Sequence, residues 1–146
     1  MYDRPVLDVD DALAIMDAAL AAAPGVTERP IAVSVVDDNG DWVAFARMDG
    51  TFAFNREFAQ RKAYTASLMR QDLRDFAAYR SKADRSLPDF GNPRLVGSAH
   101  GGLVIKDASG SVLGGLGVSG ATPEEDERIA RQALAAAPVP AAGGAA

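Results

Sequence analysis

Two charged side chains stand where an apolar segment ends in the middle of the sequence. Arg47 and Asp49 follow this segment and precede Gly50, so a guanidinium and a carboxylate meet at the end of an expected strand. Arg47 could bind a carboxylate in a bidentate fork, while Asp49 could orient it or act as a base. The alternative is a strand-end ion pair followed by an Asp-Gly turn.

Lys62 lies on the apolar side of a predicted helix, four residues after Phe58 and four before Ala66. A lysine there must extend to solvent, meet an acid or point into a cavity. We expect it to anchor an anion or, if burial lowers its pKa, to act in acid–base catalysis. Lys62→Met should keep the fold and weaken anion binding or turnover, because methionine keeps the length of the apolar stem and removes the charge. Tyr64 is displaced from the apolar stripe, so packing or an interface suits it better than the ligand contact that it could also make.

Two further positions have the chemistry of a site. His100 is the one histidine and precedes two glycines, and it could be a general base, an axial ligand to a cofactor iron, or an ordinary loop residue. Ser119 and Gly120 end the last predicted strand just before a helix, whose free N–H groups could receive an anion. The acids of residues 124–126 would repel one there.

The elements that carry these residues are two predicted β-hairpins. Residues 31–36 form an apolar, β-branched run, 37–40 are turn residues, and 41–48 return as a second strand. A strand at 103–105, a turn at 107–110 and a strand at 111–118 repeat the pattern 70 residues later. The glycines of the last strand indicate the close approach of a crossing helix, a neighbouring subunit or a flat ligand, and close packing is the preferred interpretation.

Helices are predicted around both hairpins. They span residues 9–23, capped by Asp8 or Asp10, then 55–69, capped by Asn55, then 71–80, and 122–137. The first helix should bury Val9, Leu13, Met16 and Leu20. Thr122-Pro123-Glu124-Glu125 forms a capping box at the last helix start. The chain is therefore expected to be one α/β domain over residues 1–137, with an antiparallel sheet flanked by helices and a disordered tail at 138–146.

Composition excludes several classes of function. A net charge of −5 argues against nucleic acid as a partner, and the absence of cysteine excludes disulfides and thiolate chemistry. No segment is apolar and long enough to cross a membrane, and the first residues lack a signal-peptide pattern, so a cytoplasmic protein is expected. The sequence has no phosphate-binding loop, metal-binding histidine pattern or serine nucleophile elbow.

Three ordered motifs resemble one known family. VVDDNGDWVAFARMDG, KAYTAS and GGLVIKDASGSVLGGLGVSG followed by TPEED are similar to the GlcG/HbpS-like family, across residues 9–137. That family includes secreted haem-binding proteins and a C-terminal domain of PduO-type corrinoid adenosyltransferases. The resemblance implies a profilin-like layer, often a homo-oligomer, with haem or corrinoid binding in some members. It places Asp126 near the site and offers no match for His100 as a haem ligand.

Two functions of different classes remain open at this point, beside a third possibility, an assembly or scaffold subunit, which needs only an oligomer surface. The first is a small-molecule-binding module, with haem or another tetrapyrrole as the ligand that the resemblance implies. The second is a cofactor-independent lyase or isomerase, in which Arg47 holds a small carboxylate while Lys62, Asp49 or His100 moves a proton. In either case we expect the site where the two hairpins end, bordered by Arg47, Lys62 and Ser119.

Overall fold

One sheet of four antiparallel strands lies at the centre of the protein, and the computed structural model describes residues 1–142. The strands lie in the order β2-β1-β4-β3. This arrangement confirms the predicted α/β fold, because the two hairpins join through β1 and β4 into one open sheet. In chain order the elements are α1 (Val9–Ala22), η1 (Ala23–Gly25), β1 (Ala32–Asp37), β2 (Trp42–Arg47), α2 (Ala53–Met69), α3 (Leu73–Lys82), η2 (Leu87–Phe90), β3 (Gly102–Lys106), β4 (Val112–Ser119) and α4 (Pro123–Ala136).

The two hairpins use the same turn chemistry. The Asp37 carboxylate accepts the N–H groups of Asn39 and Asp41 at 2.9 and 3.0 Å. Asp107 does the same for the N–H groups two and four residues after it, again at 2.9 and 3.0 Å. Asp side chains stabilise turns in this way. The hairpin pattern that recurs after 70 residues is therefore a repetition of the same turn geometry.

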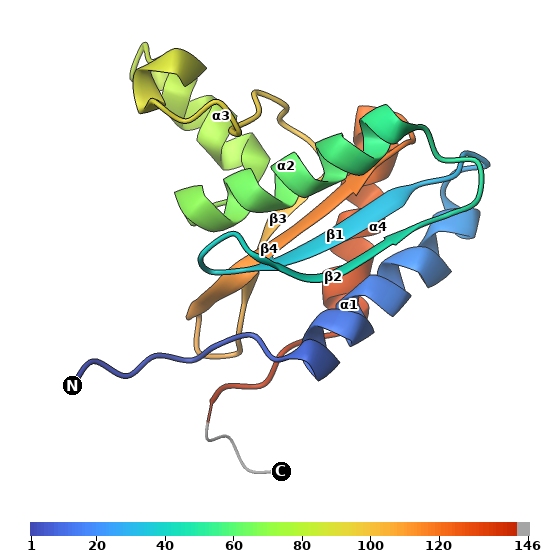
Figure 1. The fold of residues 1–146 in the computed structure, drawn as a ribbon, viewed down its shortest axis with the longest axis horizontal. Helices are drawn as coiled ribbons and strands as arrows, with labels where there is room; N and C mark the ends of the chain where they lie inside the picture. The colour runs from blue at the N-terminus through green and yellow to red at the C-terminus, as the bar shows by residue number, and fades with distance from the viewer. Residues whose placement is uncertain (143–146) are drawn as a thin grey trace.

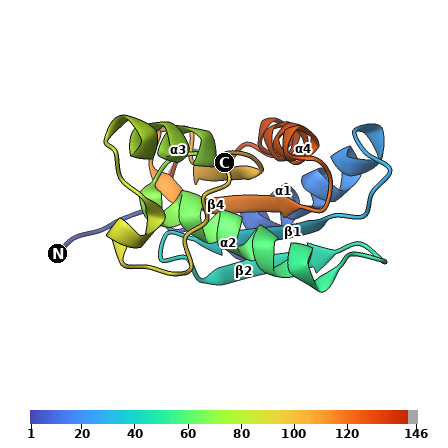
Figure 2. The same ribbon diagram turned by 90° about the horizontal axis from the view of Figure 1, so that it is seen from above.

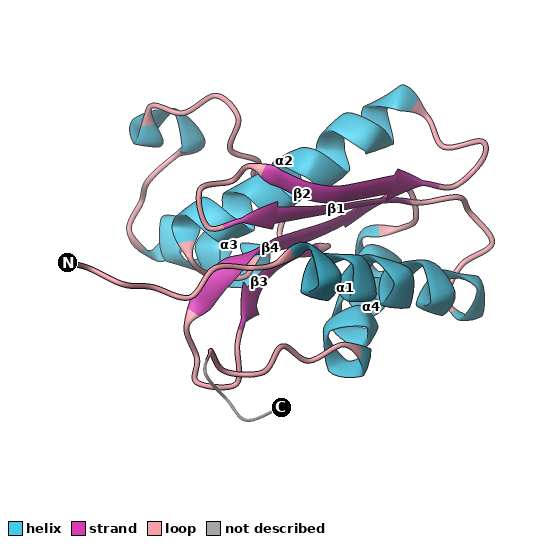
Figure 3. Ribbon diagram, turned by 60° about the horizontal axis from the view of Figure 1, so that its bottom comes forward, coloured by secondary structure: helices cyan, strands magenta, loops and turns pink. Residues whose placement is uncertain are grey.

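Helices cover both faces of the sheet. Figure 1 shows α2 crossing one face, with α3 beside it, and Figure 3 shows α1 and α4 together on the other. The larger apolar core lies under α1 and α4, where the first strand, the last two strands and both helices contribute fully buried side chains. These include Ile15, Val33, Val35, Leu116, Val118 and Ile129.

The glycines of β4 let α2 pack directly on the sheet. A Cβ added at Gly115 would collide with the carbonyl oxygen of Ala63, and one at Gly117 with that of Ala59. Glycine within a strand marks such close approach of another backbone. The preferred interpretation is confirmed, since a crossing helix of this chain occupies the space.

Two local expectations about the helices are wrong. In α1 the fully buried residues are Ala12, Ile15 and Ala19, whereas Val9 is 53 % and Leu13 39 % exposed. The alanines on the buried face let α1 approach the sheet and α4. The side of the helix that carries Val9 and Leu13 therefore faces outward. Helix α2 begins at Ala53, two residues before the predicted cap.

Val139, which was expected to lie in an unstructured tail, is 8 % exposed, and its carbonyl accepts the Ala108 N–H. The tail therefore begins with a packed residue, and positions 143–146 lie outside the described residues. None of the helices within residues 1–142 is both long and apolar enough to cross a membrane.

Candidate functional site at the strand ends

Several connections meet at one end of the sheet. Strand β1 begins there, β2 and β4 end there, and the loops that lead to and from them gather beside one another (Figure 2). Two polar regions lie at this end. One is the closed cluster, formed by Lys62, Gly101, Asp126 and Glu127. The other is the strand-end hollow, a set of surface pockets around the loop of residues 27–30.

The closed cluster is centred on an ion pair that joins helices on opposite faces of the sheet. Lys62 is 3 % exposed, and its Nζ lies 3.2 Å from Oδ2 of Asp126 in α4. The same ammonium group donates to the Val118 carbonyl at 2.8 Å. The other Asp126 oxygen accepts the Ala121 N–H at 3.0 Å. The charge of Lys62 is thus answered entirely inside the protein.

This cluster replaces one hydrogen bond of the β3–β4 ladder. Val118 N–H donates to the Gly101 carbonyl at 2.8 Å, which is half of the expected pair. The reciprocal bond is absent because Gly101 N–H donates to Glu127 Oε1 at 2.9 Å. Lys62 supplies the donor that the Val118 carbonyl then lacks. Gly101 has φ +79°, and an added Cβ would lie 2.8 Å from the lysine nitrogen, so glycine is needed here.

Glu127 continues the cluster toward the surface. The residue is 5 % exposed, and its Oε2 forms an ion pair with Arg131 at 2.6 Å. Arg131 in turn lies 3.9 Å from Asp72, whose other oxygen accepts the Val104 N–H at 2.9 Å. Charged side chains of α4 and of Asp72, at the start of α3, therefore form one connected network with a backbone N–H of β3, as buried charges require.

Burial shifts the pKa values of Lys62 and Asp126 in the directions that favour the uncharged form of each side chain. Desolvation lowers the pKa of Lys62, and the nearby Asp126 carboxylate opposes that shift. Desolvation likewise raises the pKa of Asp126, with Lys62 opposing it. The 3.2 Å distance and the satisfied hydrogen bonds favour the ion pair. A buried lysine of this kind is inaccessible to substrate in the described arrangement.

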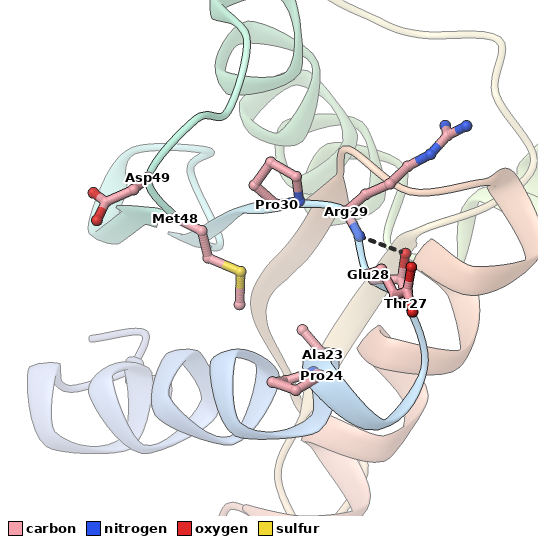
Figure 4. Close-up of a pocket in the computed structure, with 8 residues that line it drawn as sticks. All are labelled: Ala23, Pro24, Thr27, Glu28, Arg29, Pro30, Met48 and Asp49. Carbon is pink, nitrogen blue, oxygen red and sulfur yellow. Dashed lines mark hydrogen bonds between the residues drawn. The ribbon is translucent and has the colours of Figure 1, made fainter.

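The strand-end hollow has two adjoining parts. The Met48 pocket, of about 520 Å³, lies between the end of α1 and the end of β2 (Figure 4). Its lining residues are Ala23, Pro24, Thr27, Glu28, Arg29, Pro30, Met48 and Asp49. The Asn55 pocket, of about 500 Å³, shares Arg29 and Pro30 with it. It is also lined by Gly50, Phe52, Asn55, Gly120 and Ala121.

The Asn55 pocket has the features of an anion-binding surface. Helix α2 starts beside it with no side-chain cap at Phe52 and no acid in the first turn, so its first N–H groups are free of these partners. Asn55 Oδ1 accepts the Ser119 hydroxyl at 3.1 Å, which leaves the amide N–H groups as donors. Arg29 adds a positive charge, and no acidic side chain is among the lining residues.

The predicted site residues fall into different places. Asp49 lines the Met48 pocket, Gly120 lines the Asn55 pocket, and Ser119 lies behind Asn55. Arg47 is exposed on the edge strand and lines neither pocket. Neither Arg47 nor Asp49 takes part in an ion pair among the described residues. The expected pocket bordered by Arg47, Lys62 and Ser119 is therefore wrong, because Lys62 is enclosed with Asp126 instead.

Tyr64 and His100 lie away from the hollow. Tyr64 is buried, its hydroxyl accepts the Asn92 amide at 2.9 Å, and the Arg94 guanidinium stacks 3.8 Å from its ring. In this structure Tyr64 therefore has a packing role, which the sequence favoured over a ligand contact. His100 is half-buried in the segment before β3, where its backbone N–H donates to the Ser98 hydroxyl. It lines neither of the two pockets.

Sequence reasoning missed the residues that shape the hollow. Arg29 and Met48 gave no signal, because one lies in a loop and the other at a strand end among small residues. Asn55 was taken as a helix cap, and Glu127 was not singled out at all. The one available signal was Asp126, four residues after the capping threonine and placed near the site by resemblance, and it turns out to be the partner of Lys62.

One open sheet of four antiparallel strands, made of two hairpins and packed against helices on both faces, defines a small α/β domain. A model of the family described as haem degrading protein HbpS-like matches residues 7–135. The chain belongs to this HbpS-like family, as the sequence motifs indicated.

Relatives and solved structures agree with this assignment. An uncharacterised 15.0 kDa protein of Citrobacter freundii is 34 % identical over 106 residues, covering 72 % of this chain and 74 % of that protein. The PduOC:haem complex is 28 % identical with a TM-score of 0.78, covering 90 % of this chain and 95 % of that one. A double mutant of Streptomyces reticuli HbpS is 30 % identical with a TM-score of 0.80, covering 92 % of this chain and 89 % of that one.

The chain is much shorter than one of the curated proteins that it matches. It spans 32 % of the corrinoid adenosyltransferase PduO of Citrobacter freundii. The shared part is therefore a domain of that enzyme.

Proposed function

We propose that this protein binds haem or a closely related tetrapyrrole at the strand-end hollow. The observation that carries the proposal is membership of a family described by haem degradation, together with the fold shared with the PduOC:haem complex over 90 % of this chain. The proposal concerns binding and includes no chemical step. Haem supplies redox and ligand-binding chemistry when bound, and the protein supplies orientation and electrostatics.

The residues of the hollow suit such a ligand. Ala23, Pro24 and Pro30 give apolar walls, and Phe52, which is 76 % exposed, offers an aromatic face at the neighbouring pocket. Arg29 lies between the two pockets and could hold a propionate through charge-assisted hydrogen bonds. Flat apolar ligands with acidic arms need this combination of surfaces.

A haem titration of the protein, followed by absorption spectroscopy, tests the proposal. We expect a saturable Soret band distinct from that of free haem, at a stoichiometry of one per chain or one per pair of chains. The matched comparison is a titration with protoporphyrin, which lacks the iron and shows whether the ring alone is held. A spectrum identical to that of free haem at every protein concentration would remove the proposal.

The acid–base alternative lacks a comparable observation. Its central residue, Lys62, faces Asp126 and the Val118 carbonyl and borders neither the Met48 pocket nor the Asn55 pocket. Proton transfer therefore stays a hypothesis from the sequence alone. The cytoplasmic location expected from the sequence also stays a prediction.

Self-association is part of the proposal as well. Phe52 and Phe54 are 76 % and 68 % exposed, and the α1 residues Val9 and Leu13 add apolar surface that this chain does not cover. Such surface favours contact with a second copy. Sedimentation velocity at micromolar concentration is expected to give a dimer or larger species, and a clean monomer would contradict it.

A further inference from the structure

We infer that Met48 is the axial ligand through which this protein holds a haem iron, an inference that rests on the proposed function. Haem iron in proteins is bound by His, Met, Cys or Tyr side chains. The sequence has no cysteine, one histidine, three tyrosines and four methionines. Among the residues that line the pockets at the strand ends, within residues 1–142, Met48 alone belongs to these types.

The backbone of Met48 is fixed firmly enough to present a ligand. Its N–H donates to the Ile31 carbonyl at 2.9 Å, which extends the β1–β2 ladder by one residue. Its carbonyl accepts the Thr51 hydroxyl at 2.7 Å. A ligand held on such a rigid element loses little freedom on binding. The side chain is half-buried, and Figure 4 shows its sulfur between the end of β2 and the Ala23–Pro24 corner.

The charges around the hollow give the ligand one orientation. Glu28 and Asp49 line the Met48 pocket and would repel propionates. The adjoining Asn55 pocket has Arg29 and the uncapped start of α2, with no acidic residue among its lining. Met48 would therefore hold the iron of a bound haem, and Arg29, which lines both pockets, would hold its propionates on the side away from Glu28 and Asp49.

The competing ligand is His100, whose Nδ1 is buried and has no hydrogen-bond partner among the described residues. Its ring lines neither pocket, and its neighbour Gly101 is held in the closed cluster by Glu127. Binding iron there would need a different cavity from the one that the strand ends provide.

The test uses haem titrations of Met48→Leu, His100→Ala and Met69→Leu in the full chain. Leucine keeps the apolar volume of methionine and removes the sulfur, and Met69 packs in a different cluster, against the Phe76 side. We expect Met48→Leu to shift the Soret band and weaken haem binding by about tenfold or more, a difference of about 1.4 kcal/mol. The other two variants should keep the wild-type spectrum.

A second measurement does not depend on any variant folding. The near-infrared charge-transfer absorption of the wild-type ferric complex distinguishes thioether from imidazole ligation, and we expect the thioether pattern. An imidazole pattern, or a spectrum changed by His100→Ala and unchanged by Met48→Leu, would overturn the inference and leave haem binding in place. Failure of the wild-type protein to bind haem would instead overturn the proposed function.

Discussion

The closed cluster and the strand-end hollow lie at the same end of the sheet and have opposite character. In the closed cluster, Lys62 is 3 % exposed and its charge is answered by Asp126 and a backbone carbonyl. In the hollow, Arg29 is exposed and lines both pockets. Burial that is fully satisfied holds elements together, whereas a charge beside an open cavity is available to a ligand. A perturbed side chain is thus evidence of function only where something can reach it.

The largest expected effect comes from breaking the closed cluster. Lys62→Met leaves the Asp126 carboxylate buried without its cation, so we expect a loss of about 3–5 kcal/mol in the free energy of unfolding. This differs from the sequence-based expectation that the variant would keep the fold. Urea unfolding measures it, and Arg61→Met, on the exposed side of the same helix, should change stability by no more than about 0.5 kcal/mol. Equal stability of the two variants would mean that the cluster does not hold the fold.

The same variant should respond strongly to pH. Burial raises the pKa of Asp126 in the folded state, and Lys62 partly opposes this. A raised folded pKa means that the folded protein binds more protons than the unfolded chain between the two pKa values, so stability falls as pH rises through that window. Removing Lys62 raises the folded pKa further and extends this loss toward neutral pH.

We therefore expect the stability difference between wild type and Lys62→Met to be largest near neutral pH and to narrow in acid, where Asp126 is protonated in both proteins. Unfolding curves at a series of pH values measure the difference. A difference that is constant with pH would show that Asp126 is not the group left unpaired.

The glycine of the closed cluster gives a smaller effect that does not change charge. Gly101 and Gly110 both have positive φ, +79° and +89°, but only Gly101 is crowded, since an added Cβ would meet Val118 O at 2.7 Å. Alanine at either position has the same backbone strain. We expect Gly101→Ala to cost about 1–3 kcal/mol more than Gly110→Ala in thermal unfolding. Equal costs would indicate that the cluster yields easily.

The sequence was sufficient to predict the fold and to draw attention to Lys62 of the closed cluster. Hydrophobic periodicity and turn residues located every strand, and Thr122 with Glu125 forms the predicted capping box. The place of Lys62 on the apolar face of its helix also followed from its spacing, and an acidic partner was one of the three outcomes left open. These features depend on neighbours along the chain, which local rules describe.

The partners across the fold did not follow from sequence. Lys62 and Asp126 are 64 residues apart, and they meet where Gly101 N–H donates to Glu127 and the Val118 carbonyl accepts Lys62 instead. Arg47 drew attention because it ends a strand and Arg29 gave no signal, yet Arg29 is the one that lines the hollow, because the surface loop at 27–30 lies beside it. Tertiary geometry, not residue type, selects between them.

A substitution in the strand-end hollow should have the smallest effect on stability and a clear effect on haem binding. Arg29→Gln removes an exposed charge that forms no ion pair among the described residues, so unfolding should change by no more than about 0.5 kcal/mol. Haem affinity should fall by about tenfold or more, because a charge-assisted hydrogen bond to a propionate is lost. Arg61→Gln is the control and should bind as wild type does. A normal affinity in Arg29→Gln would remove Arg29 from the site.

Hydrogen exchange with and without haem, resolved by mass spectrometry, tests most directly which of the two regions meets the ligand. Our account predicts slower exchange on haem binding in peptides covering residues 23–30 and 48–55, with no change in 58–66 and 99–104. The Gly101 N–H of the closed cluster is already hydrogen-bonded to Glu127, so a ligand elsewhere should not protect it further. Protection confined to residues 99–104, around His100, would contradict the account and place the ligand at the other side of the sheet end.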